Sequence, residues 1–407
     1  MDGGGTANLE SPTNPAKRHP AMTDSTALGL DTKRLALIRS LIEADIAKRR
    51  YYGAAIAVAR HGHCGLFECI GHGDAEGKAP LKKDSVYALF STTKAFTNTL
   101  VYRAIEQGQF TLTTKVSDVI PEFSGGLRED VTFYHLLTHS SGLPSIYIPR
   151  PGMYIDRLAD IIAAICQNVH SIGKPGERVD YSPLAHHALM GEAVRRADPK
   201  QRSYRQLVED EILKPLKMND TSIGVRRDLR ARYHVPLFIT PAPVEHLGHS
   251  NLGPNGAFEE EEAEMPWVGG YSTLGDMHRF AEMLRRGGEL DGARIVSPAL
   301  LRLARQNQTG EKPNELYRPL AVSQGREPYP AYIGLGYSLR GHTIFPNLLG
   351  TLTSPETFGN YGFGSSLYWI DPVLDMTFVC LTTGVMERGA NFDRFQKLSD
   401  LAAAAAI

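Results

Sequence analysis

The sequence predicts an α+β protein in which one sheet is flanked by helices and a mostly helical domain is inserted into the sheet domain. Strand-like segments occur near both ends of the chain, and helical patterns with long loops fill the middle. A chain of 407 residues also exceeds the size at which a single hydrophobic core usually stops growing. We therefore expect a sheet domain of residues 31–88 and 265–407, a helical domain of residues 89–264, and a flexible tail of residues 1–30 that is rich in Gly, Pro, Ser and Asn.

The first elements follow from the period of their apolar residues. Residues 33–49 carry apolar side chains at helical spacing, and residues 53–73 are typical of two strands joined by a tight turn near Gly62. Residues 91–108 repeat apolar side chains with a helical period and end at Gly108. Glycine is the usual residue at that position of a helix C-terminus, so we expect a helix here.

The second half predicts a long loop, one helix and several strands. Residues 236–266 are rich in Pro, Gly and His and end in the acidic run Glu259–Glu262 with Glu264, which favours a mobile surface loop over a segment that shapes a pocket mouth. Residues 275–288 predict a helix, with Asp276 as its N-cap. The strand-like runs that follow are residues 333–340, 365–370 and 376–383.

Charge and cysteine content narrow the class of protein. The net charge of -1, from 44 basic and 45 acidic residues, gives no reason to expect nucleic acid or an anionic membrane as a partner. No apolar run approaches membrane-spanning length, and the N-terminus lacks the apolar core of a signal peptide. The cysteines at 64, 69, 166 and 380 show no disulfide-scaffold spacing, so we expect free thiols. A cytoplasmic enzyme acting on a small or uncharged molecule is the expectation, and oligomeric state stays open.

Ser91 and Lys94 lie three residues apart at the start of the helix predicted for residues 91–108. This spacing places both side chains on one helical face. A serine hydroxyl needs a neighbouring base to act as a nucleophile, and an amine serves as that base when burial lowers its pKa. The unpaired N–H groups at a helix N-terminus also favour an oxyanion beside the attacked carbon. The pair is therefore a candidate catalytic site.

The same spacing occurs a second time, at Ser171 and Lys174. These residues stand in the segment HSIGKPGE, whose Gly and Pro residues break any helix that would hold the two side chains on one face. We interpret this second pair as a decoy. Spacing alone is therefore a weak signal.

Several longer segments resemble the serine β-lactamase and penicillin-binding-protein superfamily, in the branch of class C β-lactamases, family VIII carboxylesterases and related transesterases. They stand in the family's order from about residue 33 to about residue 395. The segments are ALFSTTKAFTNTL, GQFTLTTKVSDVIPEF, VTFYHLLTHSSGLP, GKPGERVDYSPLAHHALMGEAV, VGGYSTLGDMHRFAEML, YIGLGYSL and TFGNYGFGSSLYWIDP. The resemblance implies a β-lactamase/transpeptidase-like fold, an α/β sandwich with an antiparallel sheet, and chemistry without a metal or organic cofactor.

The resemblance also implies roles for individual residues. Ser91 would be acylated, Lys94 would help to remove its proton, and Tyr181 of the Y-S-P segment would carry a proton to the leaving group. The backbone N–H groups of Ser91 and Phe363 would hold the oxyanion. How the duty of general base divides between Lys94 and Tyr181 stays open.

Two departures from the family pattern bear on the substrate. Pro183 replaces the Asn of the Y-x-N motif, and its side chain offers neither donor nor acceptor. Asn360-Tyr361-Gly362 replaces the K-T-G or H-x-G motif and carries no charge. Both changes favour ester or small amide substrates over penicillin-like ones. We expect Asn360, Tyr361, Gly362 and Pro183 at the substrate, with Tyr361 and Phe363 forming a pocket wall.

The histidines suggest other interpretations. One of His186 and His187, with His187 preferred, is a candidate to face the pocket in place of the missing Asn. His61, His63 and Cys64 lie at a predicted turn without a matching distant pair, and His135 and His139 lack the Glu of H-E-x-x-H, so neither group predicts a metal site.

The sequence thus predicts a serine hydrolase that cleaves a carboxylic ester or small amide through a Ser91 acyl-enzyme. An acyltransferase of the same fold is the first alternative, since no motif reports whether an acceptor outcompetes water. A β-lactamase or D-amino-acid peptidase is disfavoured by Pro183 and Asn360, and a non-catalytic binding protein by the retention of all three catalytic residues. No G-x-S-x-G segment is present, which argues against an α/β-hydrolase.

Overall fold

The computed structural model describes residues 19–234, 237–238, 257–386 and 388–407. Its main sheet has six strands in the order β10-β11-β12-β13-β1-β2, and every neighbouring pair is antiparallel. The strands are β1 (Gly53–Arg60), β2 (His63–Gly71), β10 (Ser338–Leu339), β11 (Phe358–Gly362), β12 (Ser366–Asp371) and β13 (Met376–Thr382). Because β1 pairs with β13, the sheet joins the two ends of the chain, as the sequence predicts.

The first hairpin shows why the chain turns where it does. His61 and Gly62 both have positive φ, 54° and 82°, between β1 and β2. Two consecutive residues with positive φ are typical of a type I′ turn, whose twist matches that of paired strands. The predicted turn near Gly62 is confirmed.

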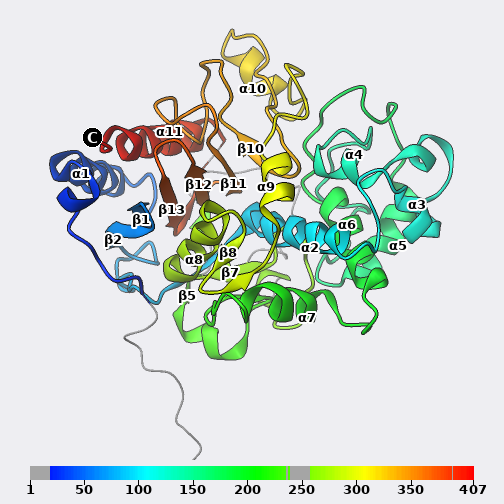
Figure 1. Cartoon of the computed structure of the whole chain (residues 1–407), viewed down its shortest axis with the longest axis horizontal. Coiled ribbons are helices and arrows are strands. Elements are labelled where there is room, and N and C mark those ends of the chain that lie inside the picture. Colours follow the sequence, from blue (N-terminus) through cyan, green and yellow to red (C-terminus); the bar gives the residue numbers. More distant parts are fainter. Residues whose placement is uncertain (1–18, 235–236, 239–256, 387) are drawn as a thin grey trace, which may run out of the picture.

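Each face of the sheet is covered by helices, as Figure 1 shows. Along β1, Ala54, Ile56 and Val58 face one core and the alternate alanines face the other, since strand side chains alternate between faces. Helices α1 (Thr32–Ala47) and α11 (Arg388–Ala404) pack side by side on the first face, and α8 (Leu274–Arg285) covers the second. This is the helix-flanked antiparallel sheet of the predicted fold class.

The middle of the chain is mostly helical. Its helices are α2 (Lys94–Glu106), α3 (Val116–Val119), α4 (Phe133–Leu137), α5 (Leu158–Asn168), α6 (Ala185–Ala197) and α7 (Tyr204–Val208), and two short helices, α9 (Pro298–Ala304) and α10 (Arg318–Ser323), follow α8. Helix α2 runs through the centre of the molecule in Figure 1 and packs on α6. Ten of its residues are buried, Lys94–Tyr102 and Ala104, so α2 is a core helix. It is buried more completely than the helical period of its apolar residues predicts.

Smaller strands surround this centre. A four-stranded sheet has the order β4-β7-β3-β5, with bounds Ser222–Ile223, Gly270–Ser272, Val86–Ala88 and Tyr233–His234. Two further pairs are β6 (Leu237–Phe238) with β14 (Gly384–Val385), and β8 (Glu289–Leu290) with β9 (Ala293–Arg294). The four-stranded sheet takes strands from both predicted domains, and the boundaries at residues 89 and 264 stay predictions.

Two local expectations need correction. Residues 1–18 lie outside the described residues, but residues 19–30 are not a free tail, because Leu28 and Leu30 are buried against the sheet. Thr273 caps α8 and Asp276 does not; the Asp276 carboxylate instead accepts hydrogen bonds from residues 220 and 221. In the loop predicted for 236–266, residues 239–256 lie outside the described residues.

The described end of that loop is anchored. Glu264 accepts a hydrogen bond from the backbone N–H of Arg205 at 3.1 Å, Glu262 pairs with the same arginine, and Glu261 pairs with Arg227 at 3.6 Å. The acidic run therefore binds neighbouring arginines, which the charge pattern alone does not reveal. Among the helices of the described residues, none has the length and apolar character needed to span a bilayer.

Candidate active site

Ser91 lies in a tight turn that leads directly into α2. The turn, Phe90–Thr93, is a 3₁₀ helix, and Phe90 has a positive φ of 48°. A non-glycine residue in this region is strained and persists only where its surroundings hold it. Here the carbonyl of Leu89 accepts from the Ser366 hydroxyl at 2.7 Å, and the Gly270 N–H donates to the Thr93 hydroxyl at 2.9 Å. Strands β12 and β7 thus fix the turn, and Ser91 itself stays half-buried.

Lys94 is buried, with 2% of its surface exposed. Its Nζ lies 2.9 Å from the Ser91 Oγ, 2.9 Å from the Pro183 carbonyl oxygen and 3.0 Å from the Trp267 carbonyl oxygen. All three partners are neutral, and burial lowers the pKa of Lys94 well below the ordinary value of 10.5. The amine is therefore held against the serine hydroxyl in a setting that favours its neutral form.

Tyr181 brings the third functional group to the same place. Burial raises the pKa of its phenol far above the ordinary 10.0, the neighbouring Tyr317 adds to that rise, and a hydrogen bond with Ser91 opposes it. The Lys94 Nζ lies 5.3 Å from the centre of the Tyr181 ring. The Tyr181 ring also packs against the His139 ring, with 4.6 Å between ring centres. The structure thus gathers Ser91, Lys94 and Tyr181 at one point.

Phe363, a predicted oxyanion residue, follows the end of β11 beside the Ser91 turn. Its ring packs on Phe90 with 6.0 Å between centres. A Cβ atom on Gly362 would lie 2.1 Å from the Leu89 carbonyl oxygen, so only glycine lets β11 approach the turn this closely. The Gly362 carbonyl accepts from the Ser365 N–H at 3.1 Å, which orients the peptide that leads into Phe363. The oxyanion role of the two backbone N–H groups stays a prediction.

The sequence matches the family model described as Beta-lactamase over residues 38–402. The chain belongs to the β-lactamase family.

Members of this family with known names or structures are similar to the chain in different degrees. Protein flp of Staphylococcus aureus strain MW2 is 31% identical over 191 residues, which is 46% of this chain and 37% of that protein. Esterase EstB of Burkholderia gladioli is 27% identical over 296 residues, 65% of this chain and 74% of that one. The chain thus spans little more than a third of the length of the first relative.

Solved structures agree on the fold. A penicillin-binding protein homologue from Caulobacter crescentus superposes with a TM-score of 0.75 and 24% identity, over 93% of this chain and 99% of that chain. A family VIII carboxylesterase gives a TM-score of 0.72 with 20% identity, over 92% and 99%. At these identities the likeness concerns the fold alone.

Two of the predicted substrate residues serve the β-lactamase-family site in other ways. Pro183 is buried, and its carbonyl holds Lys94. Asn360 is 8% exposed and its carboxamide is engaged at both ends: Nδ2 donates to the Gly336 carbonyl at 2.9 Å, and Oδ1 accepts from Tyr368 at 2.8 Å. The contact of these two residues with substrate stays a prediction.

The prediction that His187 faces the pocket is wrong. His187 has no exposed surface, and its Nε2 bonds the Asn98 side chain at 3.0 Å. Helix α6 is buried from Ala185 to Val194, so neither histidine of the pair reaches a pocket. His139 braces the site instead, because its Nδ1 accepts from the Ser182 N–H at 3.0 Å, next to Tyr181.

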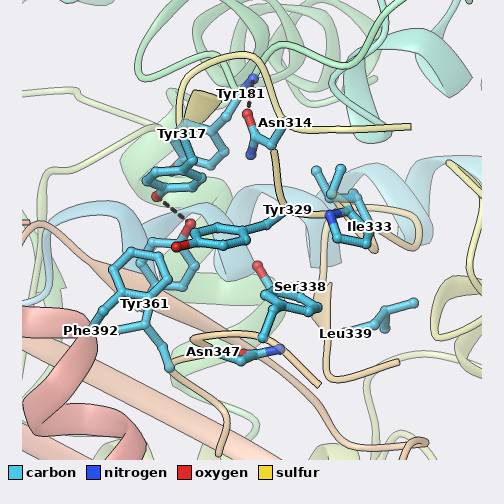
Figure 2. Close-up of a pocket in the computed structure, with 14 residues that line it drawn as sticks. Tyr181, Asn314, Tyr317, Tyr329, Ile333, Ser338, Leu339, Asn347, Tyr361 and Phe392 are labelled. Atoms are coloured by element: carbon cyan, nitrogen blue, oxygen red, sulfur yellow. Dashed lines mark hydrogen bonds between the residues drawn. The ribbon is translucent and has the colours of Figure 1, made fainter. Parts of the chain in front are cut away.

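A pocket opens on the Tyr181 side of the site, as Figure 2 shows. Tyr361 lines it, as predicted, and its hydroxyl is hydrogen-bonded to that of Tyr317. Much of the lining comes from residues 314–331, within the loop 308–332 on which we expect the pocket volume to depend but whose path the sequence does not predict. The sequence also could not predict the backbone carbonyls that hold Lys94, because every residue has a carbonyl group. No cluster of three metal-ligating side chains occurs among the described residues.

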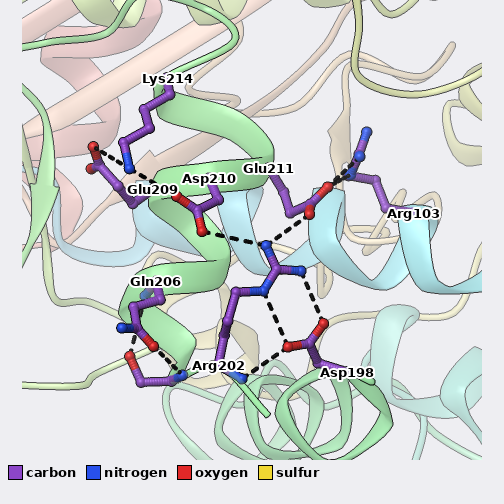
Figure 3. A network of polar contacts seen from close by, with 9 residues as sticks. Arg103, Asp198, Arg202, Gln206, Glu209, Asp210, Glu211 and Lys214 are labelled. Atoms are coloured by element: carbon purple, nitrogen blue, oxygen red, sulfur yellow. Dashed lines mark hydrogen bonds and ion pairs between the residues drawn. The ribbon is translucent and has the colours of Figure 1, made fainter. Parts of the chain in front are cut away.

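A second polar cluster includes Arg103 in the last turn of α2 and has a structural role. Figure 3 shows Arg202 between Asp198, at 2.9 Å, and Glu211, at 3.0 Å, while Arg103 of α2 also donates to Glu211 at 3.0 Å. The charges are paired with one another, so the cluster fastens α2 to the segment after α7. It thereby fixes the helix that carries Lys94.

Proposed function

We propose that this protein is a serine hydrolase that cleaves a carboxylic ester, or a small amide, through an acyl-enzyme on Ser91. The observation that carries the proposal is the set of contacts around Lys94. Its Nζ meets two carbonyl oxygens, which only accept hydrogen bonds, and one hydroxyl.

We infer the direction of the third hydrogen bond from the neutral form of the Lys94 amine. A neutral amine has two N–H groups and one lone pair, and the carbonyls of Pro183 and Trp267 take the two N–H groups. The lone pair then faces the Ser91 hydroxyl 2.9 Å away and accepts its proton. Because burial lowers the pKa of Lys94, the neutral amine needed for this arrangement is accessible. Lys94 is therefore the general base for acylation.

Tyr181 takes the complementary role. The raised pKa of its phenol keeps the group protonated near neutral pH, so it donates a proton instead of accepting one. Its ring lies 5.3 Å from the Lys94 Nζ, so we assign its proton to the oxygen that leaves the attacked carbon. We propose this division of the base and acid roles between Lys94 and Tyr181.

The resulting cycle balances. Ser91 Oγ attacks the ester carbon and passes its proton to Lys94, while Tyr181 protonates the departing alcohol, which leaves an ammonium and a phenolate around the acyl-enzyme. Water then gives its proton to the phenolate and attacks the acyl carbon, and Ser91 leaves with the proton returned by Lys94. The backbone N–H groups of Ser91 and Phe363 are the proposed oxyanion donors in both steps.

The choice of ester over β-lactam rests on Pro183 and Asn360, whose polar groups are engaged within the protein. The names of relatives agree with this choice, since Esterase EstB and a family VIII carboxylesterase are among them. Acyl transfer to an alcohol is the second candidate: a structural neighbour is titled a hydrolase with promiscuous acyltransferase activity, and a site that releases an alcohol also admits one.

Intact-mass spectrometry tests the nucleophile. Incubation with a slowly deacylated nitrophenyl ester should add one acyl group, and peptide mapping should locate it on Ser91. An adduct on a residue other than Ser91 contradicts the assignment. Full activity of the Ser91→Ala variant contradicts it as well. A chromogenic cephalosporin should turn over slowly compared with nitrophenyl acetate, and the reverse order would reject the ester preference.

A further inference from the structure

The pocket beside Tyr181 has an unusual lining for a polar reaction site. Six of its fourteen described lining residues are aromatic, and none of the fourteen carries a charge. The aromatic residues are Tyr181, Tyr317, Tyr329, Phe345, Tyr361 and Phe392. We call this the Tyr181 pocket.

The aromatic rings are held in place by one another. Tyr317 packs edge-on against Phe392 with 5.5 Å between ring centres, and Tyr329 stacks on Phe345 at 5.5 Å with an angle of 18° between planes. The hydroxyls of Tyr317 and Tyr361 are hydrogen-bonded, as the dashed line in Figure 2 shows. The rings thus form a preorganised wall that needs little ordering when a ligand binds.

The position of the pocket assigns it to one side of the substrate. Tyr181 lines the pocket and its ring centre lies 5.3 Å from the Lys94 Nζ, whereas Ser91 and Lys94 are not among the lining residues. In the proposed reaction, Tyr181 delivers its proton to the leaving oxygen. The group attached to that oxygen must therefore extend from Tyr181 into this pocket.

The chemistry of the lining selects the group. A charged substituent would lose its hydration without gaining an opposite charge, because the lining offers none. A flat aromatic ring can place its face or edge against the aromatic side chains of the lining, and a puckered ring makes fewer such contacts. Aromatic rings at this spacing gain from offset and edge-to-face contacts.

We propose that the Tyr181 pocket binds the alcohol part of the ester and prefers an uncharged planar aromatic group there. This inference rests on the proposed Ser91 chemistry. It makes the protein a hydrolase of arylalkyl esters, with the acyl group placed outside this pocket.

Three acetate esters test the inference: benzyl acetate, cyclohexylmethyl acetate and 4-carboxybenzyl acetate. Benzyl and cyclohexylmethyl alcohols leave with similar basicity, and all three esters form the same acetyl-enzyme, so kcat/KM compares the alcohol groups alone. We expect benzyl acetate to exceed cyclohexylmethyl acetate by about tenfold, and the carboxylate ester to fall by at least that factor.

A second pair of esters tests the assignment of sides. Methyl phenylacetate and methyl cyclohexylacetate carry the same two rings on the acyl side, where we expect a ratio near one. If the aromatic preference appears there instead, the pocket holds the acyl group and the proposal is overturned. If wild-type protein cleaves the acetates without distinguishing them, the pocket proposal fails alone; if it cleaves none of the esters, the proposed function fails.

Two variants connect the preference to the pocket. Tyr317→Ala should reduce the benzyl to cyclohexylmethyl ratio at least threefold, whereas Tyr317→Phe keeps the ring and should retain most of the ratio. Circular dichroism and thermal unfolding establish that both variants are folded, and Tyr329→Ala replaces Tyr317→Ala if that variant is not. A ratio unchanged in a folded alanine variant overturns the proposal.

Discussion

The chain contains the same Ser-x-x-Lys spacing twice, and the two copies differ in everything except spacing. Ser91 and Lys94 lie at the junction of a 3₁₀ turn and α2, with Oγ and Nζ 2.9 Å apart. Ser171 and Lys174 lie in a loop where the Lys174 side chain is exposed and the Ser171 hydroxyl has no hydrogen-bond partner. The Ser-x-x-Lys spacing creates a site only where a helix aligns the hydroxyl with the amine and burial lowers the pKa of the lysine.

Burial makes the larger difference between the copies. The first pair sits under Trp267, Pro183 and the Tyr181 ring, which exclude water from the amine and supply only neutral partners. An exposed lysine at the second pair is surrounded by water, which stabilises the ammonium. The predictions below test whether this difference carries the function.

The largest effect is expected for the two serines. Ser91→Ala should reduce kcat/KM for nitrophenyl acetate by roughly 10⁴-fold or more, because it removes the nucleophile. Ser171→Ala, the matched control, should change it by less than about twofold, and it removes a hydroxyl that has no partner. Equal losses in the two variants would contradict the assignment of the nucleophile.

The two lysines should differ nearly as much. Lys94→Ala should lower kcat by about 10³-fold, since general base catalysis by a positioned side chain typically contributes about 10²–10⁴-fold. Lys174→Ala should leave both kcat and KM close to wild type because its side chain is exposed. Steady-state assays across both variants decide this, and a folded Lys94→Ala enzyme with wild-type turnover would reject Lys94 as the base.

The pair Ser171 and Lys174 has no counterpart of Tyr181. Loss of the Tyr181 hydroxyl should lower kcat less than the loss of Lys94 does. Tyr181→Phe keeps the ring that packs on His139 and loses only the hydroxyl. We expect kcat to fall by about 10²-fold. The loss should be greatest for alkyl esters, whose alcohols need protonation most, and small for nitrophenyl esters. A loss independent of the leaving group would argue against Tyr181 as the acid.

The sequence predicted the parts of this site that depend on local geometry. Ser91 and Lys94 were found because residues three apart on a helix must be neighbours. The β1–β2 hairpin and strands β12 and β13 were found because their apolar runs are bounded by turn residues. Tyr181, 87 positions beyond Lys94 in the chain, was found only through its resemblance to a family motif, since no local rule brings it to Ser91.

The errors have a common physical cause: they concern groups whose partners come from elsewhere in the fold. His187 was expected at the pocket, but α6 is enclosed and turns both of its histidines into the core. The Asn360 carboxamide is held by Gly336 and Tyr368, partners that the sequence did not predict. Pro183 acts through a carbonyl that every residue possesses. Composition and spacing do not report which polar groups already have partners.

The last and smallest effect concerns stability, and it isolates the burial of Lys94. Since burial lowers its folded pKa below 10.5, the unfolded chain binds a proton that the native protein lacks between these two pKa values. Unfolding free energy therefore rises with pH across that interval. Below the folded pKa and above 10.5 the effect of Lys94 on the slope vanishes, because both states then carry the same charge.

The comparison of wild type with Lys94→Met measures this directly. The variant leaves the Pro183 and Trp267 carbonyls without their donor, which shifts its stability by an amount independent of pH. The difference in unfolding free energy, wild type minus variant, should therefore rise from neutral pH towards 10.5 with a slope of at most about 1.4 kcal/mol per pH unit. Urea titrations at several pH values, with Lys174→Met as the matched control for a lost lysine, provide the measurement. A difference that stays flat or falls with pH would mean that Lys94 is charged in the native protein, and the lone pair that should accept the Ser91 proton would then be absent.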